Sequence, residues 1–274
     1  MNKLTDSKRA QIVSALVEGC SIRSTSRMVD VSRNTITKLL LELGTVCSDY
    51  LSEHLVNLNS KRIQCDEIWQ YVGCKQKNVT VESMEVGICG DVWTWVAIDA
   101  DSKLICSWLV GKRDAGCATE FVQDLAGRLA NRVQLTTDGL KVYLNAIADA
   151  FQNDIDYGIL HKVFGAEVAN EARYSPAKCM GCEKKAAIGS PDEKHISTSY
   201  VERQNLTMRM GMRRFTRLTN AFSKKIENHV AAIALHCMYY NFCRIHQTLR
   251  ITPAMAAGLM DRLWSIEDLV NLLN

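Results

Sequence analysis

The sequence has no long apolar run and no low-complexity tract. No stretch approaches the ~18 consecutive apolar residues that a membrane-spanning helix requires, and the start, MNKLTDSKRAQ, lacks the apolar centre of a signal peptide. We therefore expect a cytoplasmic protein with no membrane partner. No internal repeat is present either. The 274 residues, 47% of them hydrophobic, fit one larger domain together with one small domain.

The sequence also has little net charge. A formal charge of +3 is too small an excess to indicate a nucleic-acid partner by itself. The distribution is more informative, because a local basic strip suits a phosphate backbone as well as it suits a solvated helix face. Between residues 203 and 225 the chain has no acid, and its cations there are Arg203, Arg209, Arg213, Arg214, Arg217, Lys224 and Lys225.

Cysteine is the one residue type in apparent excess. The eleven cysteines are scattered and mostly lie in apolar runs, where a reduced cysteine acts as a small buried hydrophobe. The metal-like spacing is Cys179-x-x-Cys182. A structural zinc site needs about four ligands, so two readings stay open here, a zinc site and a loop with two free thiols.

Residues 5–44 have the cap residues and apolar spacing of three short helices. The expected caps are Thr5 or Asp6, Ser21 and Ser32. Gly19 is expected to end the first helix, Met28 to face inward from the second, and Gly44 to end the third.

Two short helices joined by a tight turn resemble a helix-turn-helix, in which the first turns of the second helix meet base edges in the major groove. The candidate DNA-binding residues there are Arg33, Asn34, Thr35 and Lys38. Arginine can pair with guanine and asparagine with adenine. The alternative is a three-helix bundle without a nucleic-acid role. We assign residues 1–45 to this unit and 46–60 to a helical connector.

From residue 61 the pattern changes to strands and amphipathic helices in the order βββαβαβα. The expected strands are 61–73, 92–98, 104–110, 132–136 and 157–164, and the expected helices are 118–129, 141–151, a long one from about Ser199, and 223–242. This order is that of the ribonuclease H-like α/β fold, a five-stranded mixed sheet flanked by helices. We expect that domain to cover residues 61–260, with a polar hairpin segment at 75–85, a long irregular insert at 165–198 and a helical tail at 261–274.

Three acids fall at the positions of this pattern where they could meet. Asp66 lies within a strand, Asp138 at a strand exit and Glu202 on a helix. A carboxylate is unfavourable in a buried strand unless a partner or a metal compensates it. We interpret the three as ligands of two Mg²⁺ ions, with Mn²⁺ as a substitute and Asp66 as the bridge. Glu67 and Asp99 are acids of similar standing that we leave outside the site.

The segments DEIWQYVG, TTDGLKVY and YVERQN, in that order, resemble the three motifs of DDE transposases of the insertion sequence 1 family. The tail YYNFCRIHQTLRITPAMAA is similar to the ending of DDE transposases and integrases more widely. The resemblance implies metal-dependent cutting at element ends, followed by attack of the freed 3′-hydroxyl on target DNA. It places Asp66, Asp138 and Glu202 at the catalytic positions and Arg209 near the terminal DNA.

Further DNA contacts are expected on the same helix and just beyond it. Asn205 and Arg209 lie three and seven residues after the glutamate, on one stripe of the helix. Arg203 and Arg213 belong to the basic strip, and we include all four among the DNA-binding residues.

Three functions fit these residues. The first is an active transposase, which joins two DNA ends and is therefore expected to form a dimer or larger homo-oligomer on DNA, associated with the nucleoid. The second is a host-adopted, sequence-specific DNA-binding protein without catalysis. The third is a ribonuclease H-like nuclease without strand transfer.

Overall fold

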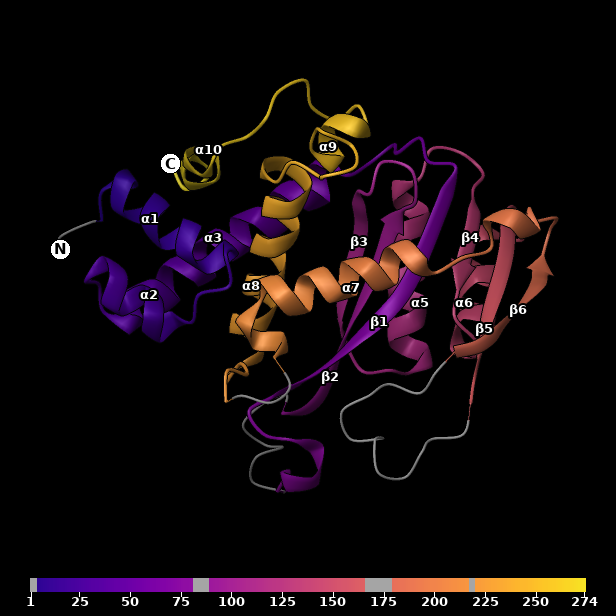
Figure 1. Cartoon of the computed structure of the whole chain (residues 1–274), viewed down its shortest axis with the longest axis horizontal. Helices are drawn as coiled ribbons and strands as arrows, with labels where there is room; N and C mark the ends of the chain where they lie inside the picture. The colour runs from indigo at the N-terminus through magenta and orange to yellow at the C-terminus, as the bar shows by residue number, and fades with distance from the viewer. Residues whose placement is uncertain (1–3, 81–88, 166–178, 217–219) are drawn as a thin grey trace.

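The computed structural model describes residues 4–80, 89–165, 179–216 and 220–274. Its centre is a mixed sheet with strand order β3-β2-β1-β4-β5-β6 (Figure 1). The strands are β1 (Arg62–Val72), β2 (Gly90–Asp99), β3 (Ile105–Gly111), β4 (Gln134–Thr137), β5 (Asp156–Phe164) and β6 (Cys179–Ile188). Strands β1, β4 and β5 are parallel neighbours, β2 is antiparallel to β1 and β3, and β6 is antiparallel to β5.

The first five strands confirm the predicted ribonuclease H-like mixed sheet, with bounds within two residues of the expected ones. The sixth is a correction, because β6 lies in the insert that we expected to be irregular. Its first eight residues are exposed, so the segment has no buried alternation for a sequence pattern to reveal. It forms instead by backbone pairing to β5. The predicted hairpin segment 75–85 contains a short helical turn, Gln76–Asn78, and residues 81–85 lie outside the described part.

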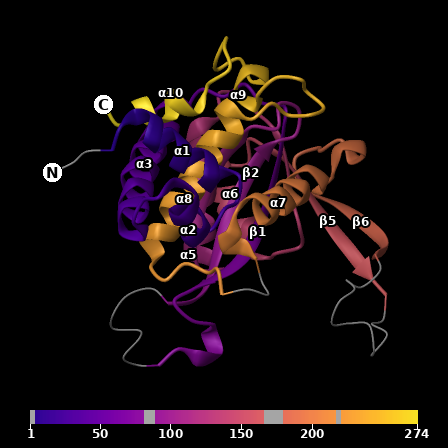
Figure 2. The same cartoon turned by 60° about the vertical axis from the view of Figure 1, so that its left-hand side comes forward.

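Helices cover both faces of the sheet (Figures 1 and 2). Helices α5 (Ala115–Arg128) and α6 (Val142–Phe151) lie on one face, and α7 (Ser199–Gly211) crosses the other. The residues that we expected to face the sheet from α7 and its exit are all buried: Val201, Met208, Met212 and Phe215. No helix in the described ranges is both long and apolar enough to cross a membrane.

The N-terminal helices α1 (Asp6–Val17), α2 (Ile22–Val29) and α3 (Arg33–His54) begin where the caps predict. The side-chain oxygens of Thr5, Ser21 and Ser32 each accept a backbone N–H from the first turn that follows. Asp30 makes the tight turn between α2 and α3 with a positive φ of 50°. Met28 was wrongly expected inside, since it is 59% exposed.

Gly44 does not end α3, which continues ten residues further to His54. The glycine instead lets α3 approach α8 (Ile226–Met238), because a Cβ at this position would lie 2.5 Å from the Cα of Ala231. A glycine inside a helical pattern can mark close packing as well as a helix end. The predicted domain limits at residues 45 and 60 stay predictions, and α3 crosses the first of them.

The C-terminal segment contacts both the N-terminal helices and the sheet. Helix α10 (Ile266–Asn271) lies beside α1, so the last helix of the chain packs against the first (Figures 1 and 2). In the tail motif, the buried Asn241 side chain bonds to both backbone groups of Ile105 in β3, at 3.0 Å each. This pairing anchors the π-helical turn Tyr239–Cys243 and the α9 segment (Pro253–Ala256) beyond it to the edge of the sheet.

Candidate active site

The three predicted acids line one cavity of about 460 Å³. Asp66 lies near the middle of β1, Asp138 follows the end of β4, and Glu202 belongs to the first turn of α7. Because β1 and β4 are adjacent parallel strands, their carboxyl-terminal parts lie at the same edge of the sheet. Residues separated by more than 130 positions in the sequence thus share one solvent-accessible hollow.

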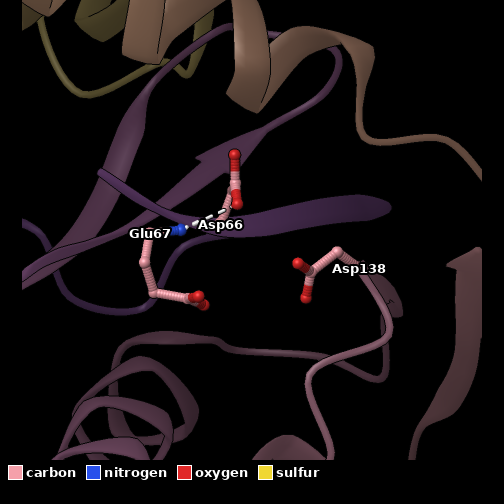
Figure 3. A group of neighbouring side chains, drawn as sticks. All are labelled: Asp66, Glu67 and Asp138. Carbon is pink, nitrogen blue, oxygen red and sulfur yellow. Dashed lines mark hydrogen bonds between the residues drawn. The ribbon is translucent and has the colours of Figure 1, made fainter. Parts of the chain in front are cut away.

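The tightest acidic group contains a residue that sequence reasoning set aside. Asp66, Glu67 and Asp138 each offer an oxygen, and these three atoms lie within 4.8 Å of one another (Figure 3). Consecutive strand residues point to opposite faces of a sheet, and in Figure 3 Asp66 and Glu67 point to opposite sides of the strand with Asp138 across from them. Glu202 lines the same cavity outside this tight group.

A residue of β1 fixes the helix that carries Glu202. The N-terminal residue Thr198 makes no side-chain cap for α7. The Oε1 atom of the buried Gln64 accepts the N–H groups of Tyr200 and Val201, at 2.8 and 3.2 Å. A helix start needs such acceptors. Gln64 is two residues before Asp66, so one strand positions both the first acid and the helix of the third.

We expect Gln64→Ala to lower the free energy of unfolding by ~1–3 kcal/mol, because two buried N–H groups lose their acceptor. DNA cleavage should fall as well, since Glu202 loses its fixed place. Urea denaturation and a cleavage assay measure the two effects. Gln70→Ala is the matched control, a buried β1 glutamine whose Oε1 accepts the N–H of Tyr71 instead. Equal loss of activity in both variants would contradict the positioning role.

The Asp66 carboxylate is oriented by two donors. Its Oδ1 accepts the Glu67 N–H at 2.9 Å, and its Oδ2 accepts Nδ2 of Asn205 at 2.8 Å. Burial raises the pKa of Asp66 to about 6, and the charges of Asp138 and Glu202 push it in the same direction. The charged form of a carboxylate whose pKa is raised in this way would be stabilised by a cation beside it. The arrangement and its hard oxygen donors fit a divalent metal ion.

Glu67 belongs to a buried network. Its side chain is fully buried, and it accepts hydrogen bonds from the Tyr143 hydroxyl and from Nε of Arg113 at 3.0 Å. Burial raises the pKa of Glu67 to about 7, against the effect of the Tyr143 bond. A second nitrogen of Arg113 lies 3.7 Å from Asp138. Arg113 thereby links Glu67 to the second predicted acid.

Sequence reasoning missed the cations of the site. Arg113 follows β3, and Lys162 on β5 pairs with Glu202, which also accepts the Thr198 hydroxyl. Neither cation lies in a distinctive motif, and only the fold brings them to the acids. Asp99, the other acid set aside, accepts the N–H groups of the turn that follows it and does not line the cavity.

The raised pKa of Asp66 predicts a pH-dependent effect in metal-free protein. Because this carboxyl binds its proton more tightly when folded, its contribution to stability falls as pH rises from about 4 to about 6. Asp66→Asn removes the titrating charge. We expect thermal denaturation in EDTA to show little difference from the unmodified protein at pH 4 and a higher Tm for the variant at pH 7. A difference that does not change with pH would contradict this account.

The predicted recognition residues lie at the start of α3. Arg33, Asn34 and Lys38 are exposed. Thr35 is half-buried, and its hydroxyl lies 2.8 Å from that of Ser32. Three of the four side chains are thus accessible to a partner.

The predicted contacts on and after α7 divide into two groups. Arg203 and Arg213 are exposed, whereas Arg209 is half-buried. Asn205 is buried against Asp66 and so belongs to the acid site.

The Cys179 and Cys182 thiols are exposed on β6, and the acid group is the one cluster with metal-ligand spacing in the described ranges.

Residues 77–172 match the family model DDE_Tnp_IS240, a DDE domain. This segment of the chain is therefore similar to the DDE domains of transposases. This match includes Asp138 and leaves Asp66 and Glu202 on either side of it. It does not confirm the insertion sequence 1 family in particular. No curated protein matches the sequence of this chain.

Several solved transposase structures resemble the chain weakly. A Mos1 transposase paired-end complex with the left transposon end has 13% identity and a TM-score of 0.25. The match covers 57% of this chain and 60% of the Mos1 chain. A piggyBac transposase synaptic complex with hairpin DNA has 12% identity and a TM-score of 0.43. That match covers 100% of this chain and 71% of the piggyBac chain. The chain thus spans less than two thirds of the first protein. TM-scores this low add nothing to what the strand order shows.

Proposed function

We propose that this protein is a DNA transposase that cuts at the ends of an insertion sequence and joins the freed 3′-hydroxyl to target DNA. The observation that carries the proposal is the single cavity lined by Asp66, Asp138 and Glu202. Those acids come from a central strand, the end of its parallel neighbour and a crossing helix. The DDE domain match over residues 77–172 supports the same chemistry.

The residues that would hold divalent metal are Asp66, as the shared ligand, with Asp138 and Glu202 on either side. Mg²⁺ is the proposed ion and Mn²⁺ its substitute, because both accept carboxylate oxygens. Bound ions of this kind stabilise charge on the attacking and leaving oxygens of a phosphodiester. Asn205 holds the Asp66 carboxylate in place.

Two cations of the chain complete the cavity. Arg113 and Lys162 line it together with the acids. Both are held by carboxylates, Arg113 by Glu67 and Lys162 by Glu202. Positive groups fixed beside a reacting phosphodiester attract it and offset the charge that develops on its oxygens.

The proposed DNA contacts extend from the start of α3 to the residues around the end of α7. They are Arg33, Asn34, Thr35, Lys38, Arg203, Asn205, Arg209 and Arg213. Because two element ends are joined in one reaction, we further propose a dimer or larger homo-oligomer on DNA. We place it in the cytoplasm and on the nucleoid when bound.

The test uses purified protein and duplexes that carry the flanking ends of the gene. We expect strand cutting with Mg²⁺ or Mn²⁺, none in EDTA, and joining of pre-cut ends to a target plasmid. Cutting without joining would indicate a ribonuclease H-like nuclease. Specific binding without cutting would indicate a host-adopted DNA-binding protein, and either result would reject the proposal.

A further inference from the structure

A second and larger cavity, of about 910 Å³, lies apart from the acids. Its walls come from the α1–α2 turn, the first half of α3, the end of α7, the segment 220–224 and α8. These segments approach closely, since a Cβ at Gly19 in the turn would lie 3.1 Å from the backbone oxygen of Gly211 in α7. The cavity therefore lies where the predicted recognition unit meets the helix that carries Glu202.

The charged side chains among the described lining residues of this cavity are all positive. Five cations line it, and no acid is among its described lining residues: Arg23, Arg33, Arg213, Arg214 and Lys224. The imidazole of His236 also lines it, and burial lowers the pKa of that group to about 4, so it is neutral at pH 7. Cations gathered without a counter-charge create a potential that attracts an anion.

Arg214 is a half-buried cation of this cavity. Its Nη1 donates to the Ser223 hydroxyl at 2.7 Å, and no described carboxylate pairs with it. Burial lowers its pKa to about 10. Burying a cation without a charged partner is unfavourable. An anionic ligand would compensate it.

A neutral polar group in the same wall also has no partner. The buried Oδ1 of Asn228 has none among the described residues. The assignment of amide oxygen and nitrogen is interchangeable on geometry alone, so this amide can equally present its NH₂ to an acceptor. The cavity wall thus holds a second group that a bound ligand could satisfy.

We propose that this cavity binds the phosphate backbone of DNA, and that Arg33 contacts this backbone instead of a base edge. The proposal rests on the proposed function, since it takes DNA as the substrate. A chain of phosphates suits the cavity better than one small anion, because five cations line a volume of about 910 Å³ and come from two regions of the chain, 23–33 and 213–224. Asn34 and Lys38 do not line the cavity, which leaves base reading to them.

This arrangement gives the cavity a role in assembly. A DNA strand held there would contact the start of α3 and the end of α7 together. Backbone contacts fix the register of a protein on DNA without reading sequence. The recognition helix and the helix of Glu202 would be aligned on the same stretch of DNA.

The first test measures binding of a random-sequence 30-base-pair duplex in EDTA, by fluorescence anisotropy over a salt series. The double variant Arg23→Ala/Lys224→Ala removes two exposed cavity cations. Arg27→Ala/Lys225→Ala removes two exposed cations just outside the cavity. We expect the first pair to weaken binding about tenfold and to reduce the log–log salt slope by ~2, about 0.9 for each lost phosphate contact. The second pair should resemble the unmodified protein, and equal effects of the two pairs would overturn the proposal.

A second test separates backbone from base contacts. Arg33→Ala should weaken the binding of end DNA and of a scrambled duplex by the same factor, whereas Asn34→Ala should weaken the end DNA more. Loss confined to end DNA in Arg33→Ala would overturn the assignment of Arg33.

Inorganic phosphate is the competitor that identifies a free-anion site. Displacement of the duplex by phosphate at micromolar concentration would reject a polynucleotide ligand. Because every measurement is made in EDTA, failure of the cleavage function would leave these results unaffected.

Discussion

Replacing Asp66 by asparagine is expected to reduce metal-dependent cleavage of end DNA by ~10³-fold or more, at least the loss seen when one electrostatic donor of an active site is removed. The variant keeps the shape of the side chain and one acceptor for the Glu67 N–H. It loses the charge that a shared metal ligand needs. Single-turnover cleavage with saturating protein separates this loss from any change in binding.

Asp154→Asn is the matched control for Asp66→Asn, because this aspartate is exposed and pairs with Arg132 away from the cavity. It should cleave at the rate of the unmodified protein. DNA binding in EDTA should be retained by both variants. Cleavage by Asp66→Asn within threefold of the control would rule out Asp66 as a metal ligand.

Gly44→Ala is expected to lower the free energy of unfolding by ~3 kcal/mol, the upper range for overpacking a well-packed core. The new methyl group would lie 2.5 Å from Cα and Cβ of Ala231 and 2.6 Å from its carbonyl oxygen. Two of these atoms are backbone, so α3 and α8 must move apart. Urea denaturation measures the change.

Gly127→Ala in α5 makes the same chemical change in open space, since nothing lies within 4 Å of the added Cβ. It should raise the free energy of unfolding by ~0.5–1 kcal/mol, the helix preference of alanine over glycine. Stabilisation in both variants would show that α3 and α8 do not pack as closely as described.

Local features of the fold could be predicted from the sequence. The caps Thr5, Ser21 and Ser32 act on neighbouring N–H groups, so the residue types alone locate three helix starts. Strand β2 shows a largely apolar and aromatic run, Val92–Ile98, that is typical of a buried strand. Gly44 was wrongly predicted to end α3, because a glycine in a helical pattern can mark either a helix end or a close helix contact. Only the position of Ala231 in space distinguishes the two. Strand β6 was missed because pairing at an exposed edge leaves no apolar pattern.

The candidate site, too, could be predicted only in part from the sequence. Asp66, Asp138 and Glu202 could be proposed because their positions on strand, strand exit and helix follow from a familiar order of elements. Arg113 and Lys162 could not, since a cation at a strand end is common and its partner is set by topology. The basic cavity could not be predicted either, because only the fold brings its cations at 23–33 and 213–224 together.

The central claim is that Asp66, Asp138 and Glu202 share divalent metal ions. Anomalous diffraction from crystals of the protein soaked in Mn²⁺, with end DNA bound, tests it most directly. The account predicts anomalous peaks that contact Asp66 together with Asp138 and Asp66 together with Glu202. Peaks confined to Cys179 and Cys182, or none at these acids at saturating Mn²⁺, would contradict it.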